Sequence, residues 1–139
     1  MTRCIHCTRC VRFLEKYGDN ETLKAFGRGG SMEIGSYITK HITSEFSGNL
    51  IDLCPVGALT CNINKFKTRH WELKKIKFVD FTNSSASLLE AHVRHNNINK
   101  NFKSSKGNNG KSIYKVTPLY DLNNNFSFIS DKSRYSYDS

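Results

Sequence analysis

Hydrophobic residues in the first sixty positions occur in short groups that glycines separate. The apolar residues within 11–14 are spaced to lie on one face of a short helix, and Gly18 predicts the end of that helix. Residues 27–31 have the sequence Gly-Arg-Gly-Gly-Ser, which predicts a tight loop. Further along, the pattern indicates a strand or turn near 34–38 and a helical turn near 40–46. The elements expected here are therefore short.

The second half of the chain has the apolar residues that strands need. Residues 76–81 and 86–93 predict strands or a short helix, and residues 113–116 predict another strand. The stretch 94–112 is rich in Asn, Lys, Ser and Gly, so it predicts a flexible loop that buries too little surface to offset the cost of ordering. An aromatic tail over 126–137 predicts packing against another chain or domain, with a frayed terminus as the alternative.

Together these patterns predict a small α+β fold in two segments. Residues 1–61 form an irregular cysteine-bearing segment, and residues 62–139 combine a basic linker with short strands that complete a larger domain. The apolar fraction of 37% lies below the roughly 45–50% of ordinary globular proteins and indicates a small core. The sequence shows neither a secretory signal nor an apolar run of the ~18–20 residues that span a bilayer.

The formal charge of +9 is concentrated in the middle of the chain. Residues 61–111 hold eleven Lys and Arg against three Asp and Glu, whereas residues 1–60 have a net charge of +1 and residues 112–139 have none. Such a basic stretch is compatible with nucleic acid, acidic lipid or an acidic protein surface, and equally with a solvated linker. Charge alone does not choose among them.

Cysteine spacing carries the clearest chemical signal. Cys4, Cys7 and Cys10 are followed by Cys54-Pro55, in the pattern C-x2-C-x2-C-x43-C-P. Each C-x2-C step lets a short loop turn around a metal site with backbone N–H groups directed at sulfur, and three such thiolates suit three corners of a cubane. A triplet followed by Cys-Pro is typical of ferredoxin-type [4Fe–4S] ligation. The spacing therefore predicts one [4Fe–4S] cluster held by Cys4, Cys7, Cys10 and Cys54, and a role in electron transfer.

The residues around the fourth cysteine have their own predicted structure. Pro55 fixes its own backbone and biases Cys54 toward an extended conformation. The sequence Val-Gly-Ala-Leu over 56–59 then predicts the beginning of a short helix.

Other ligand assignments compete with the cluster. Zinc is the main alternative metal, because four thiolates also satisfy a tetrahedral ion, but zinc ligands usually occur as two separated pairs. His6 lies inside the loop, where an outer-shell or packing role is favoured over ligation. Cys61 is interpreted as a small packing residue. An odd number of cysteines without a secretory signal argues against a disulfide framework.

Three arginines flank the triplet: Arg3, Arg9 and Arg12. Their positive charge would offset the four thiolates and favour the more negative, reduced form of a cluster. We therefore expect these arginines to raise the reduction potential.

At this point the chain resembles a known family, the large iron–sulfur subunit of respiratory complex I. The strongest part of the resemblance is Met-Thr-Arg-Cys-Ile-His-Cys-Thr-Arg-Cys-Val-Arg-Phe at 1–13. Further matching motifs are Gly27-Arg28-Gly29, Ser44-Glu45-Phe46-Ser47-Gly48-Asn49, Ile51-Asp52-Leu53-Cys54-Pro55-Val56-Gly57-Ala58-Leu59-Thr60, Trp71-Glu72-Leu73 and Ile129-Ser130-Asp131-Lys132-Ser133-Arg134-Tyr135. The resemblance is strong through residue 73, weak across 94–112 and strong again near the end.

The resemblance implies a function for the four cysteines. In that family the matching cysteines ligate a [4Fe–4S] centre on the path from NADH through flavin toward quinone. It implies that this chain is a subunit of the proton-translocating NADH:quinone oxidoreductase, in the peripheral arm, with no complete active site of its own and no membrane span. The expected location is the matrix side of the mitochondrial inner membrane, or the cytoplasmic face of a bacterial membrane.

The chain departs from the family in ways that suggest a middle fragment. Family members begin with a [2Fe–2S] ferredoxin-like domain and a His/Cys3 cluster site, and they continue into a large molybdopterin-enzyme-like domain. This chain starts after the first two and reaches only the beginning of the third, within 62–139. We therefore expect other polypeptides of the complex to supply the missing domains, and an Asn-, Lys-, Phe- and Tyr-rich composition suits an organellar gene.

Two alternative functions remain open from sequence. A zinc-stabilised nucleic-acid-binding module would explain the basic middle segment and Trp71 among its lysines, although the complex I interpretation predicts no nucleic-acid partner. A structural remnant would keep the fold without transferring electrons.

Overall fold

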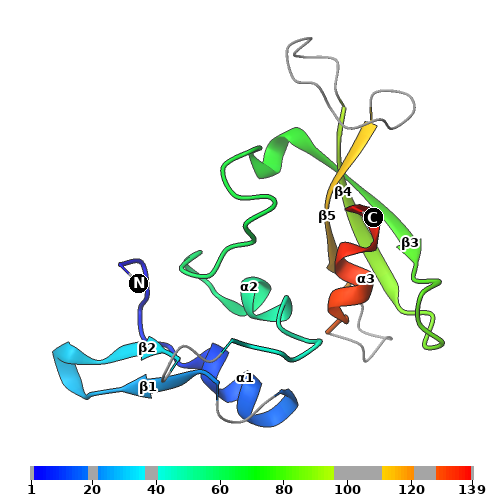
Figure 1. Cartoon of the computed structure of the whole chain (residues 1–139). Helices are drawn as coiled ribbons and strands as arrows, with labels where there is room; N and C mark the ends of the chain where they lie inside the picture. Colours follow the sequence, from blue (N-terminus) through cyan, green and yellow to red (C-terminus); the bar gives the residue numbers. More distant parts are fainter. Residues whose placement is uncertain (1, 19–21, 37–40, 96–110, 121–127, 139) are drawn as a thin grey trace. The chain divides into compact units, whose positions relative to one another are not determined.

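The chain contains short helices and antiparallel strands, which confirms the predicted α+β class (Figure 1). The structure is a computed structural model, and it divides into two compact units, Met1–Cys61 and Asn62–Ser139. The residues that it describes are 2–18, 22–36, 41–95, 111–120 and 128–138.

The first unit begins with the helix that its apolar spacing predicts. Helix α1 spans Arg9–Tyr17, and its residues Val11, Phe13 and Leu14 are buried. The helix ends at Gly18, whose backbone N–H donates to the carbonyl of Leu14 at 2.9 Å. One apolar face is thus enough to form and orient this helix.

A small hairpin follows α1. Strands β1 (Lys24–Phe26) and β2 (Glu33–Gly35) pair antiparallel, and the 3-10 turn η1 (Gly29–Ser31) lies between them. Gly27 adopts a φ of +73°, and a Cβ at this position would lie 2.7 Å from the carbonyl oxygen of Ser31. The predicted tight loop is confirmed. Of the strand or turn predicted near 34–38, the part at 37–38 lies outside the described residues.

Helix α2 precedes Cys54 in the chain, whereas the sequence predicted a helix that follows it. It spans Asn49–Leu53 and packs against α1, with Leu50 buried. Residues 56–59 form a turn, so the predicted helix there is wrong, and the helical turn predicted near 40–46 is a turn at 45–48. The Pro55 ring explains this order, because it favours an extended Cys54 (φ −76°, ψ 110°) at which α2 ends.

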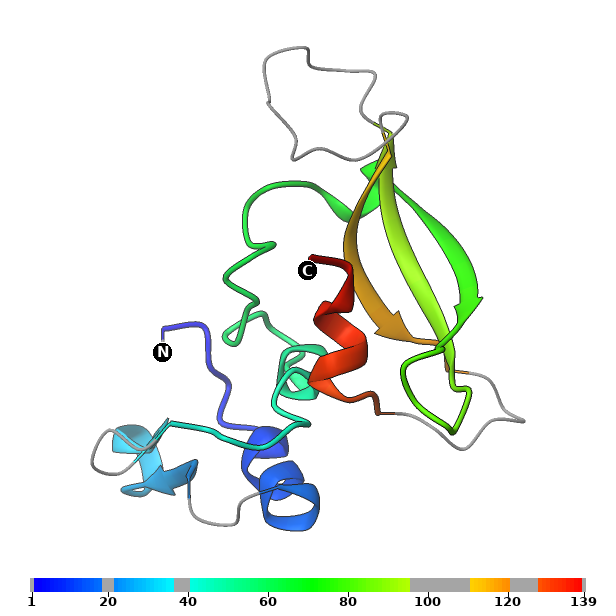
Figure 2. The ribbon, with the colours of Figure 1, turned by 45° about the vertical axis from the view of Figure 1, so that its right-hand side comes forward.

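The second unit is built on an antiparallel sheet with strand order β3-β4-β5 (Figures 1 and 2). Its strands are β3 (Leu73–Val79), β4 (Leu88–His95) and β5 (Lys111–Pro118), preceded by the 3-10 turn η2 (His70–Glu72). The strand predicted at 113–116 is confirmed, and the segments 76–81 and 86–93, predicted as strands or a short helix, form strands with shifted bounds. The flexible loop predicted at 94–112 is wrong at 94–95 and 111–112, which belong to β4 and β5, and its residues 96–110 lie outside the described residues.

The C-terminal segment packs on its own sheet. Helix α3 (Asp131–Tyr135) lies beside β5, followed by the 3-10 turn η4 (Ser136–Asp138) (Figure 2). Leu89, Val116 and Ile129 form the buried core, and Tyr137 packs against it. The expectation that the aromatic tail packs on another chain is therefore wrong for this part, because Tyr137 finds apolar partners within the unit.

A buried carboxylate joins the β3–β4 loop to α3. Asp80 is 4% exposed, and its Oδ1 accepts hydrogen bonds from the backbone N–H and the hydroxyl of Thr82 at 2.8 and 2.7 Å. Its Oδ2 accepts from the Ser133 hydroxyl at 2.5 Å and from the Asn83 amide at 3.1 Å. The backbone N–H of Asp80 also donates to the carbonyl of Ser87, closing the loop. The Asp80 side chain therefore fixes a hairpin loop to a helix residue 53 positions further along the chain.

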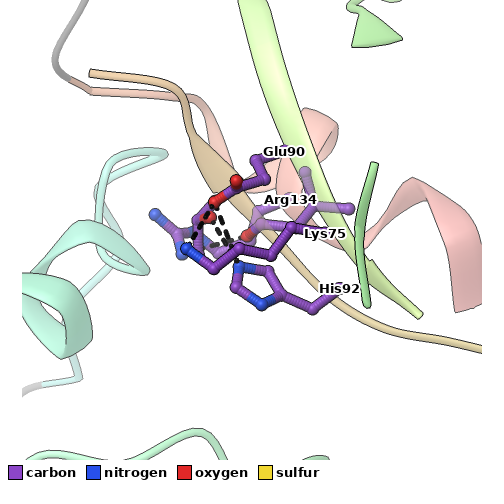
Figure 3. Close-up of polar contacts among 6 residues, drawn as sticks. Lys75, Glu90, His92 and Arg134 are labelled. Atoms are coloured by element: carbon purple, nitrogen blue, oxygen red, sulfur yellow. Dashed lines mark hydrogen bonds and ion pairs between the residues drawn. The ribbon is translucent and has the colours of Figure 1, made fainter. Parts of the chain in front are cut away.

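Figure 3 shows a second polar group on the strands of this sheet. Glu90 Oε2 lies 3.2 Å from Lys75 Nζ and 3.6 Å from His92 Nε2, and His92 Nε2 is 3.0 Å from the Thr117 hydroxyl. Lys75, His92 and Thr117 come from β3, β4 and β5, so these contacts link all three strands. The register of β4 with β5 shifts between His92 and Val93.

Candidate metal centre

The first three cysteines lie on a loop that turns sharply between them. His6 and Thr8 both adopt the left-handed conformation, with φ of +55° and +58°. This conformation is unusual for residues other than Gly, and it curls the backbone between one cysteine and the next. The backbone N–H of His6 donates to Cys4 Sγ at 3.4 Å. The loop therefore directs at least one N–H group at sulfur, as the spacing predicted.

Helix α1 holds the end of this loop. Cys10 lies in its first turn, and Thr8 is its N-cap residue. The backbone N–H of Arg12 donates to the carbonyl of Thr8 at 3.1 Å, and the Arg12 side chain donates to the carbonyl of Cys7 at 3.4 Å. Arg12 thus ties the helix to the ligand loop through two successive peptide groups.

Cys54 reaches the same place from the other end of the unit. Its backbone N–H donates to the carbonyl of Leu50, so its position is set by the end of α2. Burial raises the pKa of the Cys54 thiol, but hydrogen bonds from the backbone N–H groups of residues 56–59 outweigh it and leave the pKa below its ordinary value. The turn that replaces the predicted helix, with Gly57 at φ +64°, is what directs these N–H groups at the sulfur.

The four cysteines meet around one pocket. Cys4, Cys7, Cys10 and Cys54 line a pocket of about 360 Å³, a volume that includes its opening to solvent. The remaining lining residues are mostly apolar: Ile5, Arg9, Ile34, Pro55, Val56, Ala58 and Leu59. The hairpin contributes Ile34, which is buried. An apolar wall around four sulfurs is suited to a group whose charge must be shielded from water.

Electrostatics inside the pocket reflect the gathering of thiols. Burial raises the pKa of Cys10, the charges on Cys7 and Cys4 raise it further, and backbone hydrogen bonds offset these effects only in part. Cys10 therefore resists ionisation when no metal compensates its charge, whereas Cys54 ionises more readily than an ordinary thiol. A bound cationic core would favour all four thiolates together.

The donor set fits a [4Fe–4S] cluster. Four thiolates, backbone N–H groups aimed at sulfur, and an apolar lining are the features by which proteins hold and tune such clusters. Among the described residues, no group of three or more His, Cys, Asp or Glu side chains, the four cysteines included, is arranged to hold a metal ion. His6 and Cys61, which were not predicted to be ligands, are absent from the lining of the pocket.

Sequence reasoning missed part of this site. It did not anticipate Ile34, because a single apolar residue in a three-residue strand gives no signal of what it will face. It also assigned residues 56–59 to a helix, which hid the N–H groups around Cys54. The Gly at 57, in a segment directly after Cys-Pro, is the signal that would have indicated a turn.

No helix in the described part of the chain has the length and apolar character required to cross a membrane. The helices of the two units are between five and nine residues long.

Comparison with known proteins agrees with the chemistry of the pocket. Residues 1–60 match the family described as NADH-quinone oxidoreductase subunit 3, ferredoxin-like domain. Over 138 residues, 99% of its length, the chain is 43% identical to the mitochondrial NADH dehydrogenase [ubiquinone] iron-sulfur protein 1 of Solanum tuberosum, of which it covers 17%. It is 43% identical over its whole length to the NADH-ubiquinone oxidoreductase 75 kDa subunit of Acanthamoeba castellanii, covering 18% of that protein.

A fungal relative shows the same relationship. The mitochondrial 78 kDa subunit of NADH-ubiquinone oxidoreductase from Candida albicans is 40% identical over 138 residues, and the chain covers 17% of it. The chain thus spans less than a fifth of the length of these relatives. Identity near 40% from end to end, together with a ferredoxin-like match over residues 1–60, shows that the chain is homologous to one segment of the 75/78 kDa iron–sulfur subunit of NADH-ubiquinone oxidoreductase.

Proposed function

We propose that this chain binds one [4Fe–4S] cluster through Cys4, Cys7, Cys10 and Cys54 and relays electrons within NADH:quinone oxidoreductase. The observation that carries the proposal is the pocket, in which cysteines from two distant parts of the sequence meet around one apolar space. The relatives are subunits of an enzyme with this activity, which supports the same assignment here.

The protein's own contribution would be to hold the cluster, shield it from water and tune its reduction potential. The cluster, when bound, supplies one-electron exchange between two iron valence states. Three thiolates come from the loop before α1 and the fourth from the end of α2, so the packing of α1 against α2 sets their separation. Backbone N–H groups at His6 and at 56–59 stabilise negative charge on sulfur, and Ile34 with the apolar wall excludes water.

In the proposed pathway this chain only relays electrons. NADH and quinone react at other subunits. Electrons would arrive from NADH by way of flavin and leave toward quinone, and the energy released would drive proton translocation elsewhere in the complex. The four cysteines hold iron in this scheme, so they are ligands and do not act as acids, bases or nucleophiles. The proposed location is the matrix side of the mitochondrial inner membrane.

The second unit is proposed as the beginning of a larger domain. The relatives are several times longer than this segment, which supports assigning residues 62–139 to a larger domain. The proposed partners are other peripheral-arm subunits of the complex.

Metal analysis of the anaerobically purified chain tests the ligand assignment. We expect about four iron and four sulfide per chain, visible absorption, and an electron paramagnetic resonance signal after reduction. The Cys7→Ser variant should lose the signal, whereas Cys61→Ser should keep it. A colourless protein that holds one zinc and binds RNA with a steep salt dependence would overturn the proposal.

A second experiment separates a working relay from a structural remnant. Cys7→Ser is introduced into the native assembly, and both subunit content and NADH-to-quinone electron transfer are measured. Loss of electron transfer in an intact assembly supports the relay. Unchanged electron transfer would assign the chain a structural role only.

A further inference from the structure

Strand β3 is an edge strand of the sheet in the second unit. It pairs with β4 through seven consecutive residue pairs, from Leu73 opposite Arg94 to Val79 opposite Leu88, and no other strand pairs with it among the described residues. The irregularity of the sheet lies between β4 and β5, and β3 contains no proline. The outer edge of β3 therefore presents a regular row of backbone N–H and C=O groups.

The side chains of β3 are exposed on both faces of the sheet. Lys74, Ile76 and Phe78 alternate onto one face, and Lys75 and Lys77 alternate onto the other. Ile76 is 49% exposed and Phe78 is 36% exposed, although their cross-strand partners on β4, Ala91 and Leu89, are buried. Apolar surface of the core face thus continues outward onto the edge strand.

Positive charge on this edge is only partly neutralised. Lys75 forms its ion pair with Glu90, which lies on the same face (Figure 3). Lys74 and Lys77 form no ion pair within the part of the chain that the structure describes. Lys74 lies opposite the apolar Val93, and on the other face Lys75 and Lys77 have the one carboxylate of Glu90 opposite Lys77, so positive charge is in excess on each face of the edge.

This charge pattern disfavours a second copy of the chain as the occupant of the edge. If two β3 strands paired antiparallel about Ile76, each Lys75 would lie opposite a Lys77. If they paired parallel in register, every lysine would lie opposite its equivalent. Like charges directly across a strand pair are destabilising, whereas opposite charges contribute roughly 0.2–1 kcal/mol each. An acidic strand has the complementary pattern.

We propose that the outer edge of β3 receives an extended acidic segment of another polypeptide in the assembly, which adds a strand to the sheet. Main-chain hydrogen bonds to β3 provide affinity, apolar side chains cover Ile76 and Phe78, and carboxylates meet Lys74 and Lys77. This inference rests on the proposed function, since it requires that the chain works within a multisubunit assembly.

Site-specific crosslinking in the native assembly tests the proposal. Phe78 is replaced by the photoreactive p-benzoylphenylalanine, and crosslinked peptides are identified by mass spectrometry. We expect an intermolecular crosslink to a segment of another polypeptide that carries Asp or Glu. Phe66, which is 86% exposed and lies outside the sheet, receives the same replacement as the matched control and should not give that crosslink. A crosslink from Phe78 to a second copy or to this chain itself, or no crosslink, would overturn the proposal.

Charge reversal provides the independent measurement. Lys74→Glu with Lys77→Glu should lower the yield of the Phe78 crosslink about tenfold, because two attractive contacts become repulsive. The control Lys65→Glu with Lys67→Glu makes the same charge change at exposed positions of the basic segment and should alter the yield less than about twofold. An equal loss of crosslink in both variants would show that only the overall charge matters. That result would contradict the proposed addition of an ordered strand to β3.

Iron content shows whether the edge proposal or the proposed function has failed. If the assembly contains the chain and its cluster signal but Phe78 gives no intermolecular crosslink, the edge proposal alone fails. If the chain carries no cluster and joins no assembly, the proposed function fails first.

Discussion

At the scale of single residues, the environment of each sulfur decides what the cysteines can do. Cys10 and Cys54 carry the same thiol, yet their pKa values move in opposite directions. Burial, and to a smaller extent the neighbouring Cys7 and Cys4, raises the pKa of Cys10, whereas the turn after Cys54 surrounds its sulfur with N–H groups that lower the pKa. The spacing of cysteines predicted which residues gather, and all four line one pocket. Their ligation of iron stays a prediction.

Arg9 gives a prediction at this scale. It lines the cysteine pocket, so its positive charge should stabilise the reduced, more negative cluster. Arg9→Gln should lower the midpoint potential in a redox titration by roughly 20–40 mV, which corresponds to about 0.5–1 kcal/mol for a one-electron couple. Lys24→Gln, on exposed strand β1, removes the same charge outside the pocket and serves as the control. An unchanged midpoint potential in Arg9→Gln would show that Arg9 does not tune the potential of the cluster.

At the scale of elements, short helices and strands depend on individual contacts more than long ones do. Gly18 ends α1 as the sequence predicted, because a local backbone signal is sufficient there. The helix near Cys54 was misplaced: residues 56–59 were predicted to begin a helix, whereas α2 ends at Leu53, before the extended Cys54 that Pro55 favours. Residues 56–59 then form the turn that surrounds the Cys54 sulfur.

The β1–β2 hairpin offers a matched pair of glycines for an element-scale prediction. Gly27→Ala should destabilise the first unit by roughly 1–3 kcal/mol, since its φ of +73° disfavours a side chain and a Cβ would meet the Ser31 carbonyl at 2.7 Å. Gly30→Ala has open space around the added Cβ and should change stability by less than about 1 kcal/mol. Thermal unfolding of the reconstituted chain measures both. Equal effects would show that the hairpin does not depend on the Gly27 conformation.

Asp80 gives a prediction about acid stability. Its burial raises the pKa of the carboxyl, but hydrogen bonds from Ser133, Thr82 and Asn83 outweigh burial and hold the pKa below its ordinary value. The resulting stabilisation is complete above the unfolded pKa of about 3.9 and is lost as pH falls through the lower, folded pKa. Acid unfolding should therefore weaken the attachment of α3 below about pH 4.

Replacement of Asp80 isolates this contribution. Asp80→Asn should lower the free energy of unfolding near neutral pH by roughly 1–3 kcal/mol, because buried donors lose a charged acceptor. It should also flatten the dependence of stability on pH below about 4. Glu72→Gln removes a more exposed carboxylate, paired with Arg94, and should cost less than about 1 kcal/mol. Denaturant unfolding at several pH values measures the free energy of unfolding of both variants. Equal losses would show that the buried hydrogen-bond network of Asp80 contributes no more to stability than an exposed ion pair.

At the scale of the whole molecule, the chain consists of two compact units with different chemistry. The first gathers cysteines from two segments, and the second is a three-stranded sheet with one short helix and an exposed edge. The chain matches less than a fifth of the length of relatives that are several times longer.

Affinity purification of the tagged chain from its native source tests this interpretation. We expect it to copurify with other subunits of the complex and with NADH dehydrogenase activity. Equimolar recovery of those subunits supports a place for the chain in the assembly. Recovery of the tagged chain alone, with its cluster intact, would contradict the proposed assembly.

The sequence by itself determined which cysteines gather and where most of the regular elements lie. Cysteine spacing identified the four cysteines that line the pocket. Apolar spacing identified α1 and located the segments of the three strands, with a short helix as the alternative for two of them, because both signals are local and repeat at fixed intervals. Only the tertiary structure decided that Ile34 walls the pocket, that the turn at 56–59 surrounds Cys54, and that Asp80 binds Ser133. Those contacts join residues far apart in the chain or depend on the exact course of a turn, and no local pattern encodes which distant partner a side chain will meet.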